Sequence, residues 1–396
     1  MLIAGASAVV SKVLKVLKVV GFGLAVCLAV SASLDLVRVN PYLCRDNRVC
    51  PELGKPLSVR WDELQVALAA LHHREQAASD GQIVPAKFVV DPPAAHDREL
   101  TVMVYNIKGL PDTFRGGVHP DAFRIIGERL AARRKEGTAP DIVLLQEAFT
   151  DRAREIAHYA GYKHVVLGPE RQSKRTYWLA RPFVYLWKAA WNRSVHLESS
   201  GLMILTDLDV QTPQEVSFGH RACAGSDCLA NKGLVAVRVK LPDSNRWIDV
   251  LDTHLNSNAS SDAGIKQILF AHERQVDKIH DVITAEQGDQ DALILGGDFN
   301  SNPETIRYAY LEDRLGLKDA NSDCLIRAAC EIPHTVDLQA FWRSNELREF
   351  YRQGSSTTLQ PIRATLDFTA PVDGKPLSDH DAVEITYLVR AASAAD

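Results

Sequence analysis

The sequence predicts an α/β domain in which helices and strands form layers. The 396-residue chain has 46% apolar and 24% charged residues, the balance of a soluble protein that buries a core. Short apolar runs typical of strands alternate with helix-patterned segments, and no internal repeat interrupts them. This alternation is typical of a layered α/β domain. The composition excludes a disordered chain, a coiled coil, a collagen and a polytopic membrane protein.

Residues 1–33 have the features of a secretory signal peptide. Lys12, Lys15 and Lys18 precede an uncharged run from Val19 to Leu34 that contains several small residues. A basic start followed by a short apolar stretch is typical of such peptides, and the run is slightly short for a bilayer span. An uncleaved single-span anchor is the alternative. We expect an exported protein, periplasmic or secreted, whose N-terminus is either cleaved or anchors it to a membrane.

Six of the seven cysteines fall into close pairs: Cys44 and Cys50, Cys223 and Cys228, and Cys324 and Cys330. Sequence alone does not fix their connectivity, but local pairing is the simplest arrangement, and short, even spacing suits an oxidising compartment. A zinc–thiolate site is the alternative, although none of the pairs has the two-residue spacing of a zinc ribbon. The cysteines therefore favour export.

After residues 1–33, the chain divides into an N-terminal extension and one larger domain. Residues 34–96 form an N-terminal extension, in which residues 61–76 are expected to be helical. Asp91-Pro92-Pro93 breaks the chain before the first strand-like run, so the domain is expected to cover residues 97–392. Helices are expected over 121–135 and 264–286. Strands are expected over 100–106, 141–147, 201–206, 233–241, 247–254, 292–298 and 382–389.

Four of these strands end in polar residues, and a further strand begins with them. A buried run that ends in an acid, amide or imidazole must satisfy that group. One such end is usual, because strands commonly finish at a polar turn, but four ends together favour a shared site. The residues are Asn106, Glu147, His254, Asp298 and Asn300 at strand ends, with Asp379 and His380 at a strand start.

These residue types suit the hydrolysis of a phosphate ester. Carboxylate and amide oxygens are hard ligands for Mg²⁺, or for another divalent ion such as Mn²⁺, and Mg²⁺ usually takes only one or two carboxylates with water and phosphate. Two imidazoles offer a base near neutral pH and a donor to a developing oxyanion. Metal, water and imidazole together indicate hydrolysis.

In their order and spacing, five short motifs resemble those of the endonuclease/exonuclease/phosphatase superfamily, which has the DNase I-like fold. The resemblance extends over roughly residues 98–390. It implies a four-layer α/β/β/α sandwich of two mixed sheets, with the site at one edge of the sheets. The motifs are Tyr105-Asn106-Ile107, Leu145-Gln146-Glu147, Asp252-Thr253-His254-Leu255, Gly297-Asp298-Phe299-Asn300 and Ser378-Asp379-His380.

The resemblance implies which residues bind the metal and the phosphate. Glu147 would be the principal metal ligand. Asn106 would lie beside the metal and the phosphate, and Asp379 would lie near the metal. His254 would hydrogen-bond a phosphoryl oxygen and so stabilise charge in the transition state.

The resemblance also implies which residues handle the attacking water. Asp298 and Asn300 would orient the water and the phosphate, and His380 would be the general base. The family places an upstream aspartate at the start of a strand to orient that histidine. We select Asp337 for this role, although Leu338 replaces the family's usual aromatic, and Asp367 is the competing choice.

Within the superfamily, the chain most resembles the secreted neutral sphingomyelinase or phospholipase C-like branch. The segments that carry this resemblance are Ser200–Leu205, Asp227–Gly233 and Pro371–Leu377. Lys232 follows the loop that holds Cys223 and Cys228, where it could meet an anionic head group or phosphate. A solvated turn lysine is the plainer alternative.

Residues 174–193 mix aromatic and basic side chains, among them Trp187 and Trp191. Such a mixture suits a membrane interface, where aromatic rings lie among head groups. It also suits stacking on single-stranded nucleic acid, and the aromatics could equally pack on the sandwich. We expect Trp187 and Trp191 to contact the substrate or its membrane.

The resulting hypothesis is a monomeric, exported, Mg²⁺-dependent phosphodiesterase that cleaves the head group of a phospholipid such as sphingomyelin. A net charge of −5 provides no electrostatic reason for tight, non-specific nucleic-acid binding, yet a secreted nuclease with the same site is the main alternative. A phosphate-ester phosphatase is a further alternative. A non-catalytic surface-binding relative is the last, and it is disfavoured because all of the expected groups are present.

Overall fold

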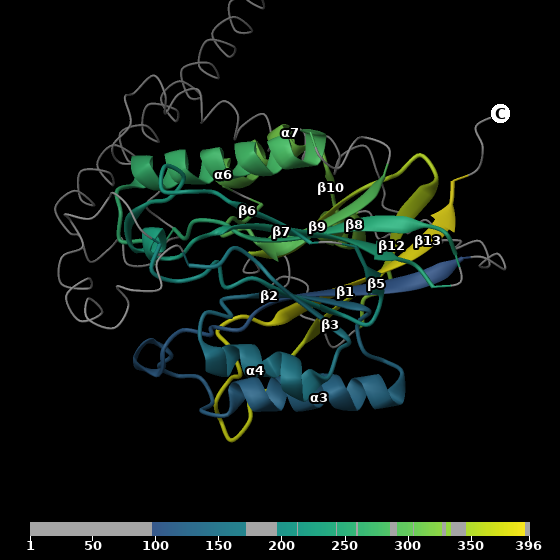
Figure 1. The fold of residues 1–396 in the computed structure, drawn as a ribbon, viewed down its shortest axis with the longest axis horizontal. Coiled ribbons are helices and arrows are strands. Elements are labelled where there is room, and N and C mark those ends of the chain that lie inside the picture. The colour runs from purple at the N-terminus through teal and green to yellow at the C-terminus, as the bar shows by residue number, and fades with distance from the viewer. Residues whose placement is uncertain are drawn as a thin grey trace, which may run out of the picture. The chain divides into compact units, whose positions relative to one another are not determined.

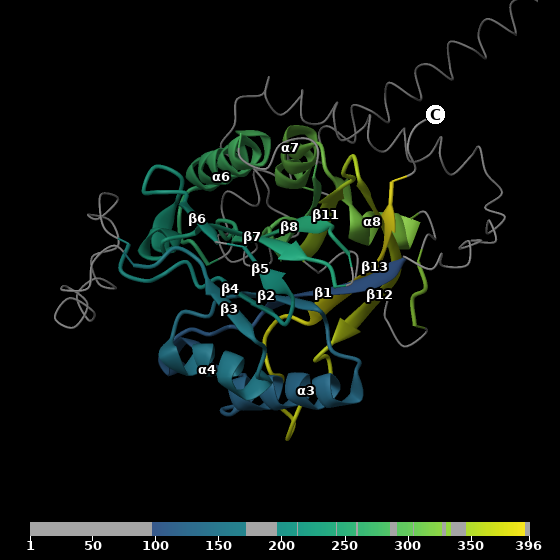
Figure 2. The same cartoon turned by 45° about the vertical axis from the view of Figure 1, so that its right-hand side comes forward.

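The computed structural model describes residues 97–171, 196–211, 213–242, 244–258, 260–285, 291–303, 305–326, 330–333 and 346–392. In these residues two β-sheets pack face to face and helices cover both outer faces (Figure 1 and Figure 2). Helices α3 (Ala122–Glu136) and α4 (Asp151–Ala160) cover one sheet, and α6 (Ile265–Ala285) and α7 (Ile306–Leu315) cover the other. The predicted four-layer α/β/β/α sandwich is therefore confirmed.

The first sheet has six strands in the order β12-β13-β1-β2-β4-β3. Strands β1 and β2 run parallel, with Asn106 opposite Gln146 at their ends. Strand β13 runs antiparallel to β1, with Val383 opposite Val104, so β13 begins at the edge where β1 and β2 end. The strands are β1 (Arg98–Asn106), β2 (Ile142–Gln146), β3 (His164–Leu167), β4 (Met203–Thr206), β12 (Thr357–Asp367) and β13 (Ala382–Ala391).

The second sheet has the order β10-β11-β9-β8-β7-β5, and β6 also pairs with β7. Strands β8 and β9 run parallel and place His254 opposite Asp298. Both sheets are therefore mixed, and each has a parallel pair at its centre. The strands are β5 (Asp209–Val210), β6 (Gln214–Ser217), β7 (Gly233–Lys240), β8 (Trp247–His254), β9 (Ala292–Asp298), β10 (Lys318–Asp319) and β11 (Leu347–Arg352).

Strand β1 shows why the two sheets stay together. Its side chains alternate between faces, as strand geometry requires. Val102 and Val104 pack in the core between the sheets, which also contains Ile294 of β9. Met103 and Tyr105 point the other way, into the core beneath α3 and α4. Because apolar side chains bury both faces of this central strand, it belongs to two cores at once.

The helices begin and end at residues suited to those positions. The Thr150 hydroxyl accepts a hydrogen bond from the Ala153 N–H and starts α4, as N-cap residues do. Gly161 directly follows α4 and Gly316 directly follows α7, and both adopt the left-handed conformation that favours glycine at this position.

The predicted strands and the two predicted helices within the described residues are all present, with ends shifted by a few residues. The expected helix over 61–76 and the segments 1–33, 34–96 and 174–193 lie outside the described residues. Strand β11 was not predicted, because Arg348 and Glu349 obscure its apolar pattern. Both are buried: Arg348 pairs with Asp319 at 2.9 Å, and Glu349 accepts a hydrogen bond from Tyr387 at 2.9 Å.

Two of the three expected cysteine pairs are confirmed as disulfides, Cys223–Cys228 and Cys324–Cys330. Cys44 and Cys50 lie outside the described residues. Local disulfides of this kind fit an oxidising compartment. Within the part of the chain that the structure describes, no helix combines the length and apolar character needed to cross a membrane.

The core between the sheets predicts a clear contrast in stability. Ile294 is fully buried there, whereas Val165 of β3 is 45% exposed. We expect Ile294→Ala to lower the free energy of unfolding by about 3 kcal/mol, and Val165→Ala to change it by less than about 0.5 kcal/mol. Urea denaturation followed by circular dichroism measures both. Equal losses for the two variants would contradict this packing.

Candidate functional site

A hydrogen-bonded cluster joins the two sheets where their central strands end. Asn106 ends β1 and Asp298 ends β9. The Asn106 side chain donates from Nδ2 to Asp298 Oδ2 at 2.8 Å and to Glu147 Oε1 at 3.1 Å. Asn106 and Asp298 are almost fully buried, each 1% exposed. The structure thus brings these three sequence-predicted residues together.

A second hydrogen bond joins the two sheets through the neighbouring strands β2 and β8. Gln146 of β2 donates from Nε2 to Asp252 Oδ1 of β8 at 2.7 Å, and neither side chain is exposed. Burial raises the pKa of Asp252 well above its usual range, because a charged carboxyl is disfavoured away from water. The two bonds fix the spacing of the sheets at this edge.

The backbone beside the cluster is strained. Glu147, Asn300 and Lys108 have φ values of 63°, 50° and 48°, in the left-handed region that non-glycine residues seldom adopt. The Lys108 N–H donates to Asn106 Oδ1 at 3.0 Å, and the Asn300 N–H donates to Asp298 Oδ1 at 2.9 Å. Each bond holds a sharp turn directly after a strand. Such strain tends to gather at functional sites.

One glycine allows these turns to approach each other. A Cβ atom on Gly109 would lie 2.2 Å from the main-chain oxygen of Glu147, so only glycine fits at that position. The loop after β1 therefore lies directly against the residue after β2.

Two imidazoles flank Asp298. Its Oδ2 lies 3.7 Å from His254 Nε2 and 4.0 Å from His380 Nε2. Burial, helped by Lys232, lowers the pKa of His254 to about 4, so its ring is neutral near pH 7. Against the effect of burial, Asp298 and other nearby carboxylates raise the pKa of His380. The surroundings therefore shift the pKa values of the two rings in opposite directions.

The pKa values of the two carboxylates, Glu147 and Asp298, also shift in opposite directions. Burial raises the pKa of Glu147 to about 7, the Asn106 hydrogen bond opposes this, and the charge of Asp298 adds to it. Burial also acts on Asp298, but the two histidines and the Asn106 amide outweigh it and lower the pKa of Asp298. Of these two carboxylates, Glu147 is therefore the one whose charge the surrounding residues stabilise less.

The donor set suits a divalent ion at Glu147. No group of three or more Asp, Glu, His or Cys side chains placed to hold a metal occurs among the described residues, but Mg²⁺ needs only one or two carboxylates besides water and phosphate. Asn106 presents its amide nitrogen to Glu147, so it would have to turn its amide to act as a ligand. Asp379 is paired instead with Lys108 at 2.9 Å.

Lys232 is buried and holds two loops together, so the alternative of a solvated turn lysine is wrong. It is 4% exposed and donates to Asp227 Oδ2 at 2.9 Å and to Leu255 O at 2.7 Å. Asp227 belongs to the short helix η2 (Gly225–Leu229), beside the Cys223–Cys228 disulfide. The predicted contact of Lys232 with substrate stays a prediction.

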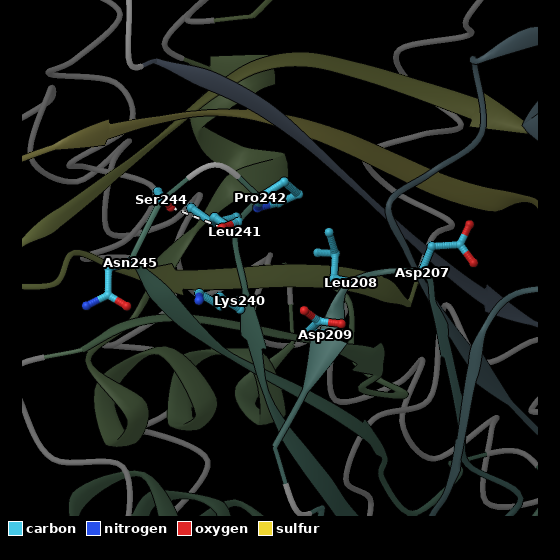
Figure 3. A pocket seen from close by; sticks show the side chains of 8 residues that line it. All are labelled: Asp207, Leu208, Asp209, Lys240, Leu241, Pro242, Ser244 and Asn245. Carbon is cyan, nitrogen blue, oxygen red and sulfur yellow. Dashed lines mark hydrogen bonds between the residues drawn. The ribbon is translucent and has the colours of Figure 1, made fainter.

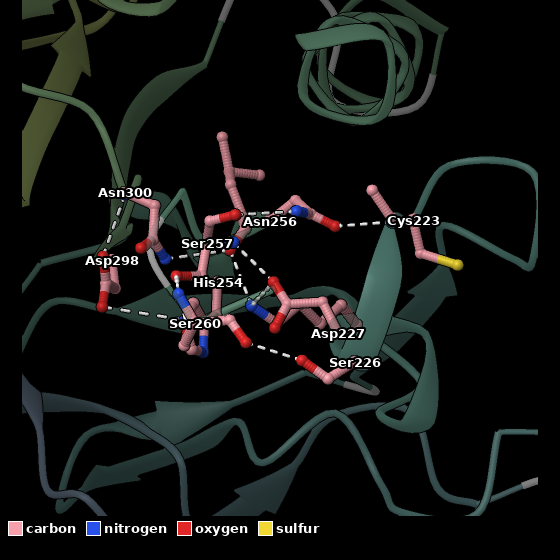
Figure 4. Close-up of polar contacts among 12 residues, drawn as sticks. Cys223, Ser226, Asp227, His254, Asn256, Ser257, Ser260, Asp298 and Asn300 are labelled. Carbon is pink, nitrogen blue, oxygen red and sulfur yellow. Dashed lines mark hydrogen bonds and ion pairs between the residues drawn. The ribbon is translucent and has the colours of Figure 1, made fainter. Parts of the chain in front are cut away.

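The loop after β8 links this lysine to the rest of the site. Figure 4 shows His254, Asp298 and Asn300 beside the hydrogen-bonded loops that contain Asp227. Asn300 donates from Nδ2 to Leu255 O at 3.0 Å, the same carbonyl oxygen that Lys232 contacts. Asn300 therefore lies in the cluster with its amide nitrogen already engaged.

Three predicted site residues, Asp337, Trp187 and Trp191, lie outside the described residues. The competing choice for the orienting carboxylate, Asp367, can be placed. It pairs with Arg133 of α3 at 2.8 Å and accepts from the Phe368 N–H. Its carboxylate is therefore committed to α3 rather than to His380.

Glu346 and Arg307 are site residues that the sequence analysis missed. Glu346 precedes β11, where Leu347 lies opposite Asp298. Burial and the charge of Asp298 raise the pKa of Glu346 to about 7, whereas the charges of His380 and Arg307 act to lower it. Arg307 of α7 is 5% exposed and donates to Asn256 O. Nothing local marks either residue, because both depend on how β11 and α7 pack.

A separate hollow lies at the other end of the second sheet (Figure 3). Its lining includes Lys240, which pairs with Trp247 at the start of β8, whereas His254 ends that strand. Asp207 pairs with Arg134 and Asp209 with Lys163, so its acids already have partners. The hollow takes no part in the site. It is lined by Asp207, Leu208, Asp209, Lys240, Leu241, Pro242, Ser244 and Asn245.

The fold is similar to that of several solved structures. A beta toxin from Staphylococcus aureus with bound magnesium ions is 16% identical, with a TM-score of 0.52 over 73% of this chain and 99% of that chain. Sphingomyelinase C from Streptomyces griseocarneus is 18% identical, with a TM-score of 0.52 over 75% of this chain and all (100%) of that chain. D. rerio TDP2 complexed with single-strand DNA product is 16% identical, with a TM-score of 0.50 over 73% and 98%.

The family assignment comes from the sequence match. No curated protein matches the chain. Residues 103–371, more than half of the chain, match the Endonuclease/Exonuclease/phosphatase family. The matched stretch includes Asn106, Glu147, His254 and Asp298, and the solved structures above share the sandwich that the motifs predicted. The chain therefore belongs to the endonuclease/exonuclease/phosphatase family.

Proposed function

We propose that this chain is an exported, divalent-cation-dependent phosphodiesterase that cleaves the head group of a phospholipid of the sphingomyelin class. The observation that carries the proposal is the meeting of Glu147, Asp298, His254 and His380 at one edge of two joined sheets. The similarity in fold to a sphingomyelinase C and the acidic net charge support a lipid substrate. The two disulfides support export.

His380 would take the proton of the attacking water. Its side chain is 23% exposed, and its Nε2 lies 4.0 Å from Asp298 Oδ2, so the ring contacts both solvent and the cluster. The base must be neutral, while the surrounding carboxylates raise its pKa. When bound at Glu147, a divalent cation would offset those carboxylates and polarise a phosphoryl oxygen.

His254 would hold the phosphoryl group, and Asn300 would orient the attacking water. His254 is neutral near pH 7, and its Nδ1 is buried without a partner, so a hydrogen-bonding atom of the ring is unused. Asn300 uses its amide nitrogen on Leu255, which leaves its side-chain oxygen for the attacking water. Asp298, fixed by Asn106, would keep both imidazoles oriented.

The orienting carboxylate for His380 has two candidates. Asp337 stays the sequence-based proposal. Glu346 is the second candidate: it is one of four described carboxylates whose charges raise the pKa of His380, and its position next to Leu347, opposite Asp298, favours it.

A secreted nuclease is the second candidate function. The observation that favours it is the similarity in fold to D. rerio TDP2 complexed with single-strand DNA product. The same residues would act on a nucleic-acid phosphodiester, and Trp187 and Trp191, which we propose as lipid contacts, would then stack on bases.

Substrate-resolved turnover tests the proposal. We expect the full chain with Mg²⁺ to release phosphocholine from sphingomyelin liposomes, to leave plasmid DNA intact, and to stop when EDTA removes the cation. Phosphatidylcholine liposomes test the choice of lipid. Cleaved plasmid with intact lipid would assign the nuclease function instead, and turnover unaffected by EDTA would exclude a divalent cation.

Removing the proposed base tests the mechanism. We expect His380→Ala to lower kcat by about 100- to 10,000-fold, the usual contribution of a general base, without changing the thermal unfolding midpoint by more than a few degrees. His158→Ala on the exposed face of α4 is the matched control and should keep full activity. Full turnover by His380→Ala would assign the proton transfer to another group.

Glu147 is the residue to test for cation binding. We expect Glu147→Gln, which keeps the shape of the side chain but removes its charge, to weaken Mn²⁺ or Mg²⁺ binding by at least about tenfold. Isothermal titration calorimetry measures this without turnover. Glu155→Gln on the exposed surface of α4 should bind the cation as the parent chain does. Unchanged binding by Glu147→Gln would place the cation elsewhere.

A further inference from the structure

Lys108 is a cation of the site that the motifs did not single out. It lies two residues after Asn106, and its N–H donates to Asn106 Oδ1 at 3.0 Å. Its φ of 48° and the tight fit of Gly109 against Glu147 hold its main chain next to the carboxylate proposed to bind the cation. The side chain is 18% exposed.

The pairing of β1 with β13 explains what Lys108 contacts. Val104 lies opposite Val383 in this antiparallel pair, so the segment after β1, which holds Lys108, and the segment before β13, which holds Asp379, lie at the same edge of the sheet. Lys108 Nζ indeed lies 2.9 Å from Asp379 Oδ2. The Ser378 hydroxyl donates to Asn106 O at 2.6 Å, which holds this loop against the end of β1 independently of the lysine.

This ion pair can open at little cost. Asp379 is 51% exposed, and ion pairs open to solvent contribute little to stability. The ammonium group has three N–H donors, and the pair with Asp379 uses one of them. A phosphate oxygen that arrives from solvent could therefore replace the carboxylate on the same lysine.

The neighbouring cations are not available in this way. Lys232 is 4% exposed and donates to Asp227 and to Leu255 O. Arg307 is 5% exposed and donates to Asn256 O. Of these three cations of the described site, Lys108 alone combines an exposed partner with unused donors.

Releasing Asp379 would also change the charge of the site. The charge of its carboxylate contributes to raising the pKa of both Glu147, the proposed cation ligand, and His380, the proposed base. In the free protein Lys108 neutralises that carboxylate. A phosphate on Lys108 would take over this neutralising charge.

We propose that Lys108 is a substrate-binding residue whose ammonium leaves Asp379 and binds a non-bridging oxygen of the substrate phosphate. In the free protein, the Asp379 carboxylate binds the Lys108 ammonium in place of the phosphate. The inference rests on the proposed function, because it names the contact through which the same site recognises phosphate.

Inorganic phosphate is the probe that tests this contact. Its binding to the full chain is measured by calorimetry in EDTA, so that no cation contributes. We expect Lys108→Met to weaken phosphate binding by about tenfold or more, as for the loss of a charge-assisted hydrogen bond. We expect Asp379→Asn to tighten it by about threefold, because the competing carboxylate is gone, and the double variant to bind as Lys108→Met does.

Two further variants act as controls. Lys163→Met removes an exposed lysine that is paired with Asp209 at 2.8 Å at the other end of the sheets, and it should leave phosphate binding unchanged. Lys108→Arg keeps the charge and should restore most of the affinity, which also covers the case in which Lys108→Met fails to fold.

The proposal predicts opposite changes in phosphate affinity for the two single variants, weaker binding for Lys108→Met and tighter binding for Asp379→Asn. If both variants lost phosphate affinity to a similar extent, the ion pair would serve only to hold the two loops together, and the proposal would be overturned. The absence of phosphate binding to the parent chain would also overturn it. Turnover of sphingomyelin and plasmid by the same preparations tests the proposed function separately from the phosphate contact of Lys108. The expected phosphate pattern without any turnover would leave this inference standing and remove the proposed function.

Discussion

The hydrogen bond from Asn106 to Asp298 is the contact on which the site depends. It joins the first sheet to the second at 2.8 Å, and the same amide reaches Glu147. Gln146 and Asp252 repeat the connection one strand further along. Because the two cores on either side of β1 fix that strand, the amide holds the carboxylates at a set spacing.

Asp298 organises the electrostatics of this arrangement. It lies between two imidazoles and accepts from the Asn106 amide and the Asn300 N–H, so its charge is stabilised despite burial. Glu147 receives less support, and its pKa rises to about 7. The same environment thus shifts the pKa values of the two carboxylates in opposite directions, and does the same to the two histidines. Environments that separate similar groups in this way are typical of sites that transfer protons.

The ion pair of Lys108 with Asp379 joins two distant segments of the chain. Lys108 follows Asn106 closely in sequence, yet its partner Asp379 comes from the far end of the domain. Lys108 follows β1 and Asp379 precedes β13, and the antiparallel pairing of these strands brings the two segments to the same edge of the sheet. Similarly, Glu346 reaches the site through the register of β11 on β9. Both residues show that the site's charge balance is set by strand pairing between distant segments.

The sequence by itself determined the layered fold, the strands of the two parallel pairs and the polar residues at their ends. These follow from local patterns, because an apolar run that stops at Asn106, Glu147, His254 or Asp298 marks both a strand and its exit. Only the tertiary structure decided the partners: Lys232 with Asp227, Asp367 with Arg133, and Lys108 with Asp379. It also revealed β11, whose buried Arg348 and Glu349 hide its pattern. Such contacts depend on register and on burial of charge, which no local pattern records.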